Sequence, residues 1–281
     1  MLDLSVVIPV RNAEEQLDEC LASIMRCQPR EIIVVDGNST DRTLSIARKY
    51  PVQILSDDGR GLPVARLLGA EAACSRWVAL IDADVVVPEG ALERLLTEFV
   101  EGGYIALQAG LNSVSGPGYW GRALANHHRT GRSKDWFGLV ATVFEREGLL
   151  EIGFDPRFTS GEDIEVRWRL GQSGARVGVS QHTFVTHRFG DTFTFAREQW
   201  DADGRGLARM IGKHRLRGTL LLALPLAAGI RGIALSLVRR QPSWTLYYAC
   251  FMFFNYVAML SELGRRPAGD GMLASARGLG S

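Results

Sequence analysis

Short apolar runs alternate with stretches of helical periodicity over about the first 200 residues of the chain. The apolar runs lie at 5–9, 31–35, 52–55 and 77–81, and between them apolar residues recur every three or four positions. This alternation is typical of βαβ units. Because the runs are nearly continuously apolar, we expect the sheet to be buried on both faces. The sequence therefore predicts an α/β fold with a Rossmann-like, mixed but mainly parallel sheet flanked by helices.

Local signals predict where some of the elements begin. Asn12, with a glutamate three residues later, has the spacing of a helix-capping box. Pro88 stands where a proline often opens a helix. Beyond residue 104 glycines interrupt the pattern, and the polar, basic stretch 126–136 predicts a binding surface more than a core. A last short strand is expected near residue 177.

The chain is long for one domain and changes composition along its length. Its 281 residues exceed the typical single domain. We expect an α/β domain at 1–205, a C-terminal membrane-associated helical region at 206–266, and a disordered tail rich in Gly, Ala and Ser at 267–281.

Two long apolar stretches, 219–238 and 243–263, form a predicted hydrophobic helical pair. Each reaches the roughly 20 residues needed to cross a hydrocarbon core about 30 Å thick. Arg231 would be costly at mid-membrane depth, so the first stretch either spans the bilayer or lies in its interface. The arginines and lysine outside the pair outnumber the two between the stretches, which favours cytoplasmic ends. A buried pair that completes a soluble domain or a dimer is the alternative.

Charge and cysteine content exclude several classes of protein. Lys+Arg 32 against Asp+Glu 31 gives a net charge of +1, so we expect no nucleic-acid partner. The four cysteines lack CxxC or zinc-ligand spacing and are predicted to be buried thiols in a reducing compartment: Cys20, Cys27, Cys74 and Cys250. The N-terminus enters a strand without the features of a secretory signal.

Polar residues follow three of the predicted strands directly. Ligands bind outside the carboxyl ends of strands in an open parallel sheet, so these residues are expected to share one edge. They are Arg11, Asn12, Glu14, Asp36, Asn38, Asp82 and Asp84. A carboxylate such as Asp36 can accept hydrogen bonds from a base or ribose, and loop amides favour phosphate oxygens. A helix-capping turn would explain Asp36 equally well.

Asp82 and Asp84 carry the more specific signal. Two carboxylates separated by one small residue at the end of a buried strand are costly unless a cation lies between them. Mg²⁺ or Mn²⁺ would take one or two carboxylates and complete its coordination with diphosphate oxygens and water. An ordinary surface turn is the alternative.

Two further features are weak when taken alone. Glu162 and Asp163 follow a glycine-containing loop, where acidic residues often do no more than favour a helix N-terminus. His187 stands among apolar residues and by itself is more typical of a satisfied core histidine.

Taken together, the motifs resemble the family 2 glycosyltransferases, which have the GT-A fold. The resemblance covers residues 4–190 and rests on motifs that occur in the family's order, namely Val7 to Glu14, Val34 to Asp41, Arg60 with Gly61, Ala65 with Arg66, Ile81 to Asp84, Phe144 to Glu147, Ile152 to Asp155, Gly161 to Asp163, and His187. Each motif is loose, but their order and spacing make coincidence improbable. Gly37 and Ile152 depart from the family's commonest pattern. These departures leave open which base is preferred and how tight the acceptor loop is.

The resemblance implies a role for each of these positions. The nucleotide-binding residues would be Pro9, Val10, Arg11, Asn12, Glu14, Asp36, Asn38, Arg66 and Asp82. Among them Asp36 would read the base, Arg66 would lie near the donor phosphates, and Asp82 would touch ribose or the donor sugar. Asp84 would bind the divalent metal with His187 as a second protein ligand. Asp163 would be the catalytic base, with Glu162 beside it.

These roles imply an inverting transfer from a nucleoside-diphosphate sugar, UDP- or GDP-linked, to an acceptor hydroxyl. The metal would stabilise charge on the departing diphosphate, and the base would take the acceptor's proton. The donor is made in the cytosol, so the catalytic domain is expected at the cytoplasmic face of the membrane.

The acceptor, a saccharide or a lipid-linked molecule, is expected to contact residues between the donor and base motifs. Trp136, Phe137 and Gly138 are the predicted acceptor residues. The neighbouring aromatic and basic side chains would suit sugar rings and a lipid phosphate or form a solvated loop; they are Trp120, His127, His128, Arg129, Arg132 and Lys134.

Three other classes compete with this interpretation. A dinucleotide-dependent oxidoreductase is disfavoured because no Gly-x-Gly-x-x-Gly turn follows the first strand. A nucleotidyltransferase that makes nucleotide-sugars normally carries a glycine-rich phosphate loop there, which is also absent. A catalytically silent membrane scaffold would have no reason to keep four carboxylates at one edge.

Overall fold

The computed structural model describes residues 2–131 and 137–265 of the chain. In this part of the chain, eight strands form one sheet in the order β3-β2-β1-β4-β7-β6-β8-β5. The strands are β1 (Leu2–Val10), β2 (Pro29–Asp36), β3 (Gln53–Ser56), β4 (Trp77–Ile81), β5 (Val85–Val86), β6 (Ala106–Ser115), β7 (Ala141–Glu145) and β8 (Val177–Phe189). The predicted tail at 267–281 and Trp136 lie outside the described residues.

The pairing of the strands confirms a mixed, mainly parallel sheet. β1 pairs in parallel with β2 and with β4, and β2 pairs in parallel with β3. β7 is antiparallel to both of its neighbours, whereas β6 and β8 run parallel to each other. The carboxyl ends of β1, β2 and β4 therefore meet at one edge, which we call the donor edge.

Helices cover both faces of the sheet, as the continuous apolar strands predict. On one face α1 (Leu17–Arg26), α2 (Thr43–Ala47) and α4 (Ala91–Glu101) share a core cluster with Val6 and Ile8 of β1. On the other face α3 (Leu62–Ala72), α6 (Arg146–Ile152) and α7 (Glu162–Ser173) share a second cluster with Val7. Successive residues of β1 thus enter different cores, which is why the run carries no polar alternation.

Two predicted helix starts are wrong. Asn12 does not cap α1, which begins five residues later at Leu17; instead the Asn12 side chain accepts a hydrogen bond from the backbone N–H of Thr40 at 2.9 Å. Asn12 also has a φ of 50°, so the chain bends sharply there. Pro88 likewise lies before α4, whose N-cap is Gly90. In both cases the residues expected to start a helix form a tight turn after a strand, and the helix begins a few residues later.

The region beyond residue 104 is more regular than its glycines predict. β6 has ten residues and β8 has thirteen, so β8 is not the short strand expected. Gly110 of β6 is required by packing, because an added Cβ would lie 2.5 Å from the ring of Phe184 on β8. The polar, basic stretch begins inside α5 (Tyr119–Thr130).

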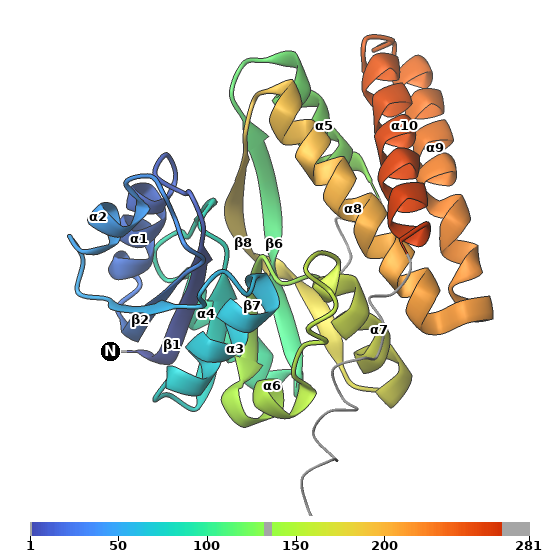
Figure 1. Cartoon of the computed structure of the whole chain (residues 1–281). Coiled ribbons are helices and arrows are strands. Elements are labelled where there is room, and N and C mark those ends of the chain that lie inside the picture. Colours follow the sequence, from blue (N-terminus) through green and yellow to red (C-terminus); the bar gives the residue numbers. More distant parts are fainter. Residues whose placement is uncertain (1, 132–136, 266–281) are drawn as a thin grey trace, which may run out of the picture.

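The C-terminal part consists of helices stacked beside the sheet domain. α8 (Phe193–His214), two short 3₁₀ turns at Arg215–Arg217 and Thr219–Ala223, α9 (Leu224–Val238) and α10 (Trp244–Leu263) follow β8. Figure 1 shows α9 and α10 side by side, with α8 and α5 between them and the sheet. The predicted boundary between 205 and 206 lies within α8, a continuous helix that contacts both parts.

The cysteine prediction is partly wrong. None of the four cysteines, all within the described residues, forms a disulfide, but only Cys20 is buried. Cys74 is exposed at the end of α3, and the other two are half-buried. An apolar neighbourhood in the sequence does not fix which side of a helix faces the core.

Candidate active site

The loops after β1 and β2 form a single hydrogen-bonded wall at the donor edge. The backbone N–H of Asn12 donates to Ser39 Oγ at 2.9 Å. Glu14 accepts from both the backbone and the side chain of Arg42, at 3.0 Å each, and the pKa of Glu14 is lowered by these bonds. The structure thus brings together the predicted residues of these two loops.

Asp36 ends β2 and is almost fully buried. Its carboxylate accepts a hydrogen bond from the backbone N–H of Ser39 at 3.1 Å. Asn38 between them has a φ of 61°, in the left-handed region. The bond stabilises a tight turn but caps no helix, because α2 begins only at Thr43. Base reading by Asp36 stays a prediction.

Arg66 of α3 joins the donor edge to the predicted base segment. Its guanidinium donates to Asp82 Oδ1 at 2.9 Å and to Glu162 Oε1 at 2.5 Å, and its side chain is 3% exposed. The Nε atom has no partner among the described residues. Because it binds one carboxylate at each terminal nitrogen, Arg66 positions both of them. Its expected place near the donor phosphates stays a prediction.

Asp82 lies between two opposing influences. Burial and the nearby charge of Asp84 raise its pKa and Arg66 lowers it, and the net result is a pKa of about 6. Its backbone N–H donates to Val140 O at 2.9 Å, which fixes the end of β4 against the start of β7. The ionised form of a carboxyl group in this environment would be stabilised by a further cation or by hydroxyl groups that donate hydrogen bonds to it.

Asp84 and His187 face each other across the β5–β8 pair. His187 Nε2 lies 3.2 Å from Asp84 Oδ2, and the backbone N–H of Arg188 donates to Asp84 O at 3.0 Å. Burial lowers the pKa of His187, but the carboxylates of Asp84 and Asp82 together raise it by more, so the pKa lies above its ordinary value. Strand pairing therefore holds the two predicted metal ligands together although 102 residues separate them in the chain.

These two residues fit a divalent metal. Among the described residues, Asp84 Oδ1 and His187 Nδ1 are buried and have no hydrogen-bond partner. Neighbouring ligands of one octahedral ion at about 2.1 Å are roughly 3 Å apart, close to the separation of the facing atoms. The described residues contain no cluster of three or more metal-ligating side chains. This donor set suits Mn²⁺ or Mg²⁺, which keep diphosphate oxygens and water as further ligands.

Glu162 and Asp163 begin α7 but have different surroundings. Glu162 is buried against Arg66, and burial raises its pKa. Asp163 is partly exposed, and its Oδ2 would lie 3.7 Å from a Cβ added at Gly138. Of the two predicted catalytic carboxylates, only Asp163 is open to an acceptor; Glu162 is placed to hold the segment through Arg66.

Residues 5–149 match the family model described as glycosyl transferase family 2. The chain belongs to glycosyl transferase family 2. The match covers the donor-edge loops, Arg66, Asp82 and Asp84, and stops before Asp163.

Curated relatives agree with this assignment. Succinoglycan biosynthesis protein ExoA of Rhizobium meliloti is 28% identical over 245 residues, which cover 79% of this chain and 74% of that protein. Pre-mycofactocin glycosyltransferase of Mycobacterium tuberculosis is 29% identical over 203 residues, 66% of this chain and 42% of the relative. 4,4'-Diaponeurosporenoate glycosyltransferase of Staphylococcus aureus is 36% identical over 104 residues, 34% of this chain and 28% of the relative. The protein is a glycosyltransferase.

Solved structures show the same GT-A fold. The mannosyltransferase PcManGT from Pyrobaculum calidifontis, in complex with GDP-Man and Mn²⁺, has a TM-score of 0.64 at 20% identity, covering 92% of this chain and 87% of that one. S. aureus TarS 1-349 in complex with UDP-GlcNAc has a TM-score of 0.55 at 17% identity, with coverage of 96% and 95%.

The predicted acceptor residues of the glycosyltransferase separate in the structure. Gly138 borders Asp163, and its N–H donates to the buried Gln108 Oε1 at 3.0 Å. Phe137 instead packs in the core against Phe144, so an acceptor contact for it is not supported. Trp136 lies outside the described residues.

The two histidines considered for the acceptor lie within α5, among aromatic rings. His127 packs against Tyr247, Tyr248 and Phe251 of α10, and His128 packs against Phe189 of β8. Burial lowers the pKa of both, that of His127 to about 4. They contribute to the packing of the C-terminal helices and are not presented to a ligand on an open loop.

Gln108 and Asp203 lie beside predicted site residues and were missed by sequence reasoning. A buried glutamine in the otherwise apolar first half of β6 is a signal that could have been used. Asp203 on α8 reaches solvent, yet the surrounding protein raises its pKa to about 7, and the charge of Asp163 adds to that rise. No local pattern marks Asp203, because its proximity to Asp163 arises only when α8 packs on α7.

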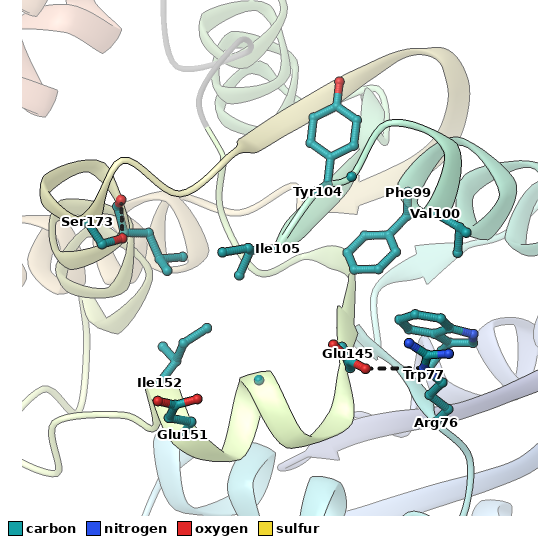
Figure 2. A pocket seen from close by; sticks show the side chains of 13 residues that line it. Arg76, Trp77, Phe99, Val100, Tyr104, Ile105, Glu145, Glu151, Ile152 and Ser173 are labelled. Carbon is teal, nitrogen blue, oxygen red and sulfur yellow. Dashed lines mark hydrogen bonds and ion pairs between the residues drawn. The ribbon is translucent and has the colours of Figure 1, made fainter.

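A cavity of about 500 Å³ lies at the opposite edge of the sheet. Trp77, Phe99 and Ile105 line it, and Glu145 pairs with Arg76 at its border, as Figure 2 shows. Trp77 begins β4 whereas Asp82 follows its end, and five strand residues span about 16 Å. The cavity is therefore not part of the donor edge.

Proposed function

We propose that this glycosyltransferase transfers a sugar from a UDP- or GDP-linked donor to an acceptor hydroxyl with inversion at the anomeric carbon. The observation that carries the proposal is the bridge made by Arg66. One buried guanidinium joins Asp82, at the donor edge, to Glu162, the neighbour of Asp163. Donor-side and acceptor-side carboxylates are thereby held in one rigid unit.

Each group has a part in the proposed reaction. The wall formed by the loops after β1 and β2 binds the nucleoside, with Asp36 and Asn38 nearest the base. Asp82 accepts hydrogen bonds from ribose or donor-sugar hydroxyls. A metal ion held by Asp84 and His187 would supply Lewis-acid stabilisation of the departing diphosphate. Asp163 takes the proton of the attacking hydroxyl, a contribution typically of about 10²–10⁴-fold.

The single displacement needs no nucleophile from the enzyme. Cys20 lies close to the donor edge, with its Sγ 3.7 Å from Asp82 O, but burial raises the pKa of its thiol, so it remains protonated. The acceptor hydroxyl is therefore the nucleophile, and it approaches past Gly138, where the absence of a side chain leaves room beside Asp163. The structures in complex with GDP-Man and Mn²⁺ and with UDP-GlcNAc support this class of donor.

A ligand panel tests the donor proposal. Thermal unfolding is measured with UDP and with GDP, each with and without Mn²⁺, and with NAD and ATP for comparison. We expect stabilisation by one nucleoside diphosphate only when Mn²⁺ is present. Nucleotide-sugars of that base are then screened for enzyme-dependent release of the diphosphate. Stabilisation by NAD alone, or none by either diphosphate, would contradict the proposal.

We further propose that α9 and α10 bind the enzyme to the cytoplasmic face of a membrane. Both Thr219–Val238 and Trp244–Leu263 are long and apolar enough to cross a bilayer. Their outer surface is apolar, with Ile230 and Leu237 of α9 and Phe253 and Leu260 of α10 each more than half exposed. An exposed apolar surface of this kind marks a membrane or protein contact.

The packing of α10 favours attachment in the interface over a transmembrane crossing. α10 contacts α8 from Tyr247, which accepts from Trp200 Nε1 at 3.4 Å, to Glu262, which pairs with Arg209. α8 carries charged residues along its length, and each would cost about 3 kcal/mol at the bilayer centre. Arg231 is turned toward α5, where it donates to Thr130 O at 3.2 Å.

This attachment would place the active site next to the lipid surface. A membrane-associated acceptor, such as a lipid-linked saccharide, could then reach Asp163 without leaving the bilayer. The names of two relatives, a succinoglycan biosynthesis protein and a diaponeurosporenoate glycosyltransferase, support an acceptor of saccharide or lipid class.

A further inference from the structure

α8 and the loop before Asp163 touch backbone to backbone. A Cβ added at Gly206 would lie 2.9 Å from Cα of Gly161, and one added at Gly161 would lie 2.7 Å from Cα of Gly206. Gly161 is the N-cap of α7 and has a φ of 75°. The two glycines therefore allow α8 to press directly on the residue that precedes Glu162 and Asp163.

Arg209, one turn further along α8, ties the same loop to α10. Its Nη1 donates to Thr159 Oγ1 at 2.8 Å and to Ser160 Oγ at 3.2 Å. Its Nε donates to Glu262 Oε1 of α10 at 2.8 Å. The guanidinium of Arg209 thus binds both the loop that precedes α7 and the last turn of α10.

Glu262 needs cationic partners at its position in α10, and besides Arg209 the exposed Arg265 donates to its other carboxylate oxygen at 3.3 Å. A carboxylate in the last turn of a helix is repelled by the negative end of the helix dipole. Glu262 lies in the last turn of α10, and its side chain and that of Arg209 are 16% and 18% exposed. A largely buried pair is screened less by water than a surface pair, so its geometry is well defined.

α8 is also pressed against α10 directly opposite the loop. An added Cβ at Gly204 would meet Asn255 O and would lie 3.0 Å from Ala258 Cβ, both on α10. Small residues at 204 and 206 let α8 fit between α10 on one side and Gly161 on the other. A displacement of α10 would therefore be transmitted to the start of α7.

We propose that Arg209 is a positioning residue that couples α10 to the base segment 159–163, so that sugar transfer depends on the C-terminal helix being docked. This inference rests on the proposed function, in which Asp163 acts on the acceptor proton. Misplacing a reacting group by about 1 Å can cost on the order of 10²-fold in rate. The donor site lies at the ends of β1, β2 and β4, whereas the hydrogen bonds of Arg209 go to Thr159, Ser160 and Glu262, so we expect donor affinity to be independent of Arg209.

The test compares Arg209→Gln with a matched control in the full chain. Arg197→Gln removes another α8 arginine, which lies over the ring of Phe254 on α10 and pairs with Asp201 but does not reach the base segment. We expect Arg209→Gln to lower kcat for diphosphate release by about tenfold to hundredfold. UDP or GDP affinity with Mn²⁺ should change by less than about twofold. Arg197→Gln should leave both quantities near wild type, and Arg209→Lys should restore part of kcat.

Two further variants keep the inference testable if Arg209→Gln does not fold. Glu262→Gln breaks the α10 arm of the contact, and Thr159→Val with Ser160→Ala breaks the loop arm. Both should lower kcat and leave diphosphate affinity unchanged. An unchanged kcat in Arg209→Gln, or in both replacement variants, would overturn the inference. So would a parallel loss of kcat, diphosphate affinity and melting temperature, because that is the signature of a merely structural role.

The outcomes separate this inference from the proposed function. The coupling alone would be overturned if the wild type is active, Asp163→Asn is inactive and Arg209→Gln is fully active. A wild-type enzyme that releases no diphosphate from any nucleotide-sugar would overturn the proposed function and the coupling with it.

Discussion

Arg66 shows how a single residue can organise a site. Its one positive charge is shared by two carboxylates from different parts of the chain, Asp82 after β4 and Glu162 at the start of α7. Burying a charge is costly unless it is paired, so Arg66, Asp82 and Glu162 fix one another's positions. Asp84 and Asp163 are not held in this way and keep oxygen atoms available for a metal and for an acceptor.

The first residue-scale prediction concerns Asp84. Asp84→Asn should weaken Mn²⁺-dependent binding of the nucleoside diphosphate by about tenfold or more, which corresponds to about 1.4 kcal/mol. The reason is that the amide carries no charge and offers one oxygen fewer to the cation. Isothermal titration calorimetry with and without Mn²⁺ measures the effect. Asp3→Asn, an exposed aspartate at the other end of β1, is the control. Equal affinity with and without Mn²⁺ in the wild type would refute the metal site.

The second residue-scale prediction concerns Asp163. Asp163→Asn should keep diphosphate affinity and lose about 10²–10⁴-fold in transfer rate, because the amide cannot accept the acceptor's proton. Steady-state kinetics and calorimetry on the same preparation separate the two quantities. If the variant transfers sugar at nearly the wild-type rate, the base lies elsewhere, and Glu162 would be examined next.

At the scale of elements, α5 links the C-terminal helices to the sheet. His127 of α5 lies against Tyr247, Tyr248 and Phe251 of α10, and Arg231 of α9 approaches the end of α5. Small residues on α9 allow a close approach as well, since a Cβ at Gly229 or Gly232 would collide with side chains of α10. The helices therefore pack as one layer, and a charge placed inside that layer should loosen it.

Acidification places such a charge on His127. Burial, assisted by Arg231, lowers the folded-state pKa of His127 to about 4, whereas the ordinary value is 6.5. Because the folded state disfavours the proton, this contribution to stability is complete above pH 6.5 and is lost as the pH falls toward 4. At about 1.4 kcal/mol per pKa unit, the loss is at most about 3 kcal/mol.

The prediction is that His127→Phe flattens the pH dependence of stability between pH 6.5 and 4. Denaturant unfolding in detergent, followed by tryptophan fluorescence, measures the free energy of unfolding at each pH. His182→Gln, at an exposed histidine of β8, should retain the wild-type pH dependence. The same slope in His127→Phe as in the wild type would show that His127 does not control this packing.

At the scale of the whole molecule, the enzyme has two different surfaces. The sheet domain carries the donor edge, and the α9–α10 layer, which lies on the other side of α8 in Figure 1, carries exposed apolar side chains. α8 contacts both α10 and the base segment through Arg209, so the proposed membrane-binding layer and the candidate active site share one helix. Shortening the chain near residue 206 would expose Trp200, which is fully buried beneath α10, so surface substitutions are the cleaner test of membrane binding.

The whole-molecule prediction is that Phe253→Glu with Leu260→Glu releases the enzyme from lipid. Both side chains are exposed on α10, so the changes should leave the fold intact while making insertion of this surface unfavourable. Flotation with phosphatidylcholine–phosphatidylglycerol vesicles measures the bound fraction. Val100→Glu with Ile105→Glu, two exposed apolar residues of the sheet domain, should float like the wild type. A wild type that stays in solution as a monodisperse dimer would show that the apolar layer is a subunit interface.

The sequence by itself determined the local features of this protein. Continuous apolar runs specify strands buried on both faces, and the residues that directly follow β1, β2 and β4 reach one edge because parallel strands end together. The order of the motifs specified the family. These properties depend on neighbouring residues and on strand direction, and both can be predicted from the sequence.

Only the tertiary structure decided how distant residues meet. Asn12 stabilises the loop after β2 instead of capping α1, Arg66 joins two carboxylates that are 80 residues apart in the chain, and Phe137 enters the core. The approach of α8 to Gly161, and with it the place of Arg209, depends on contacts between segments about 45 residues apart. Such contacts are selected by shape and charge complementarity among packed elements, which no local periodicity encodes.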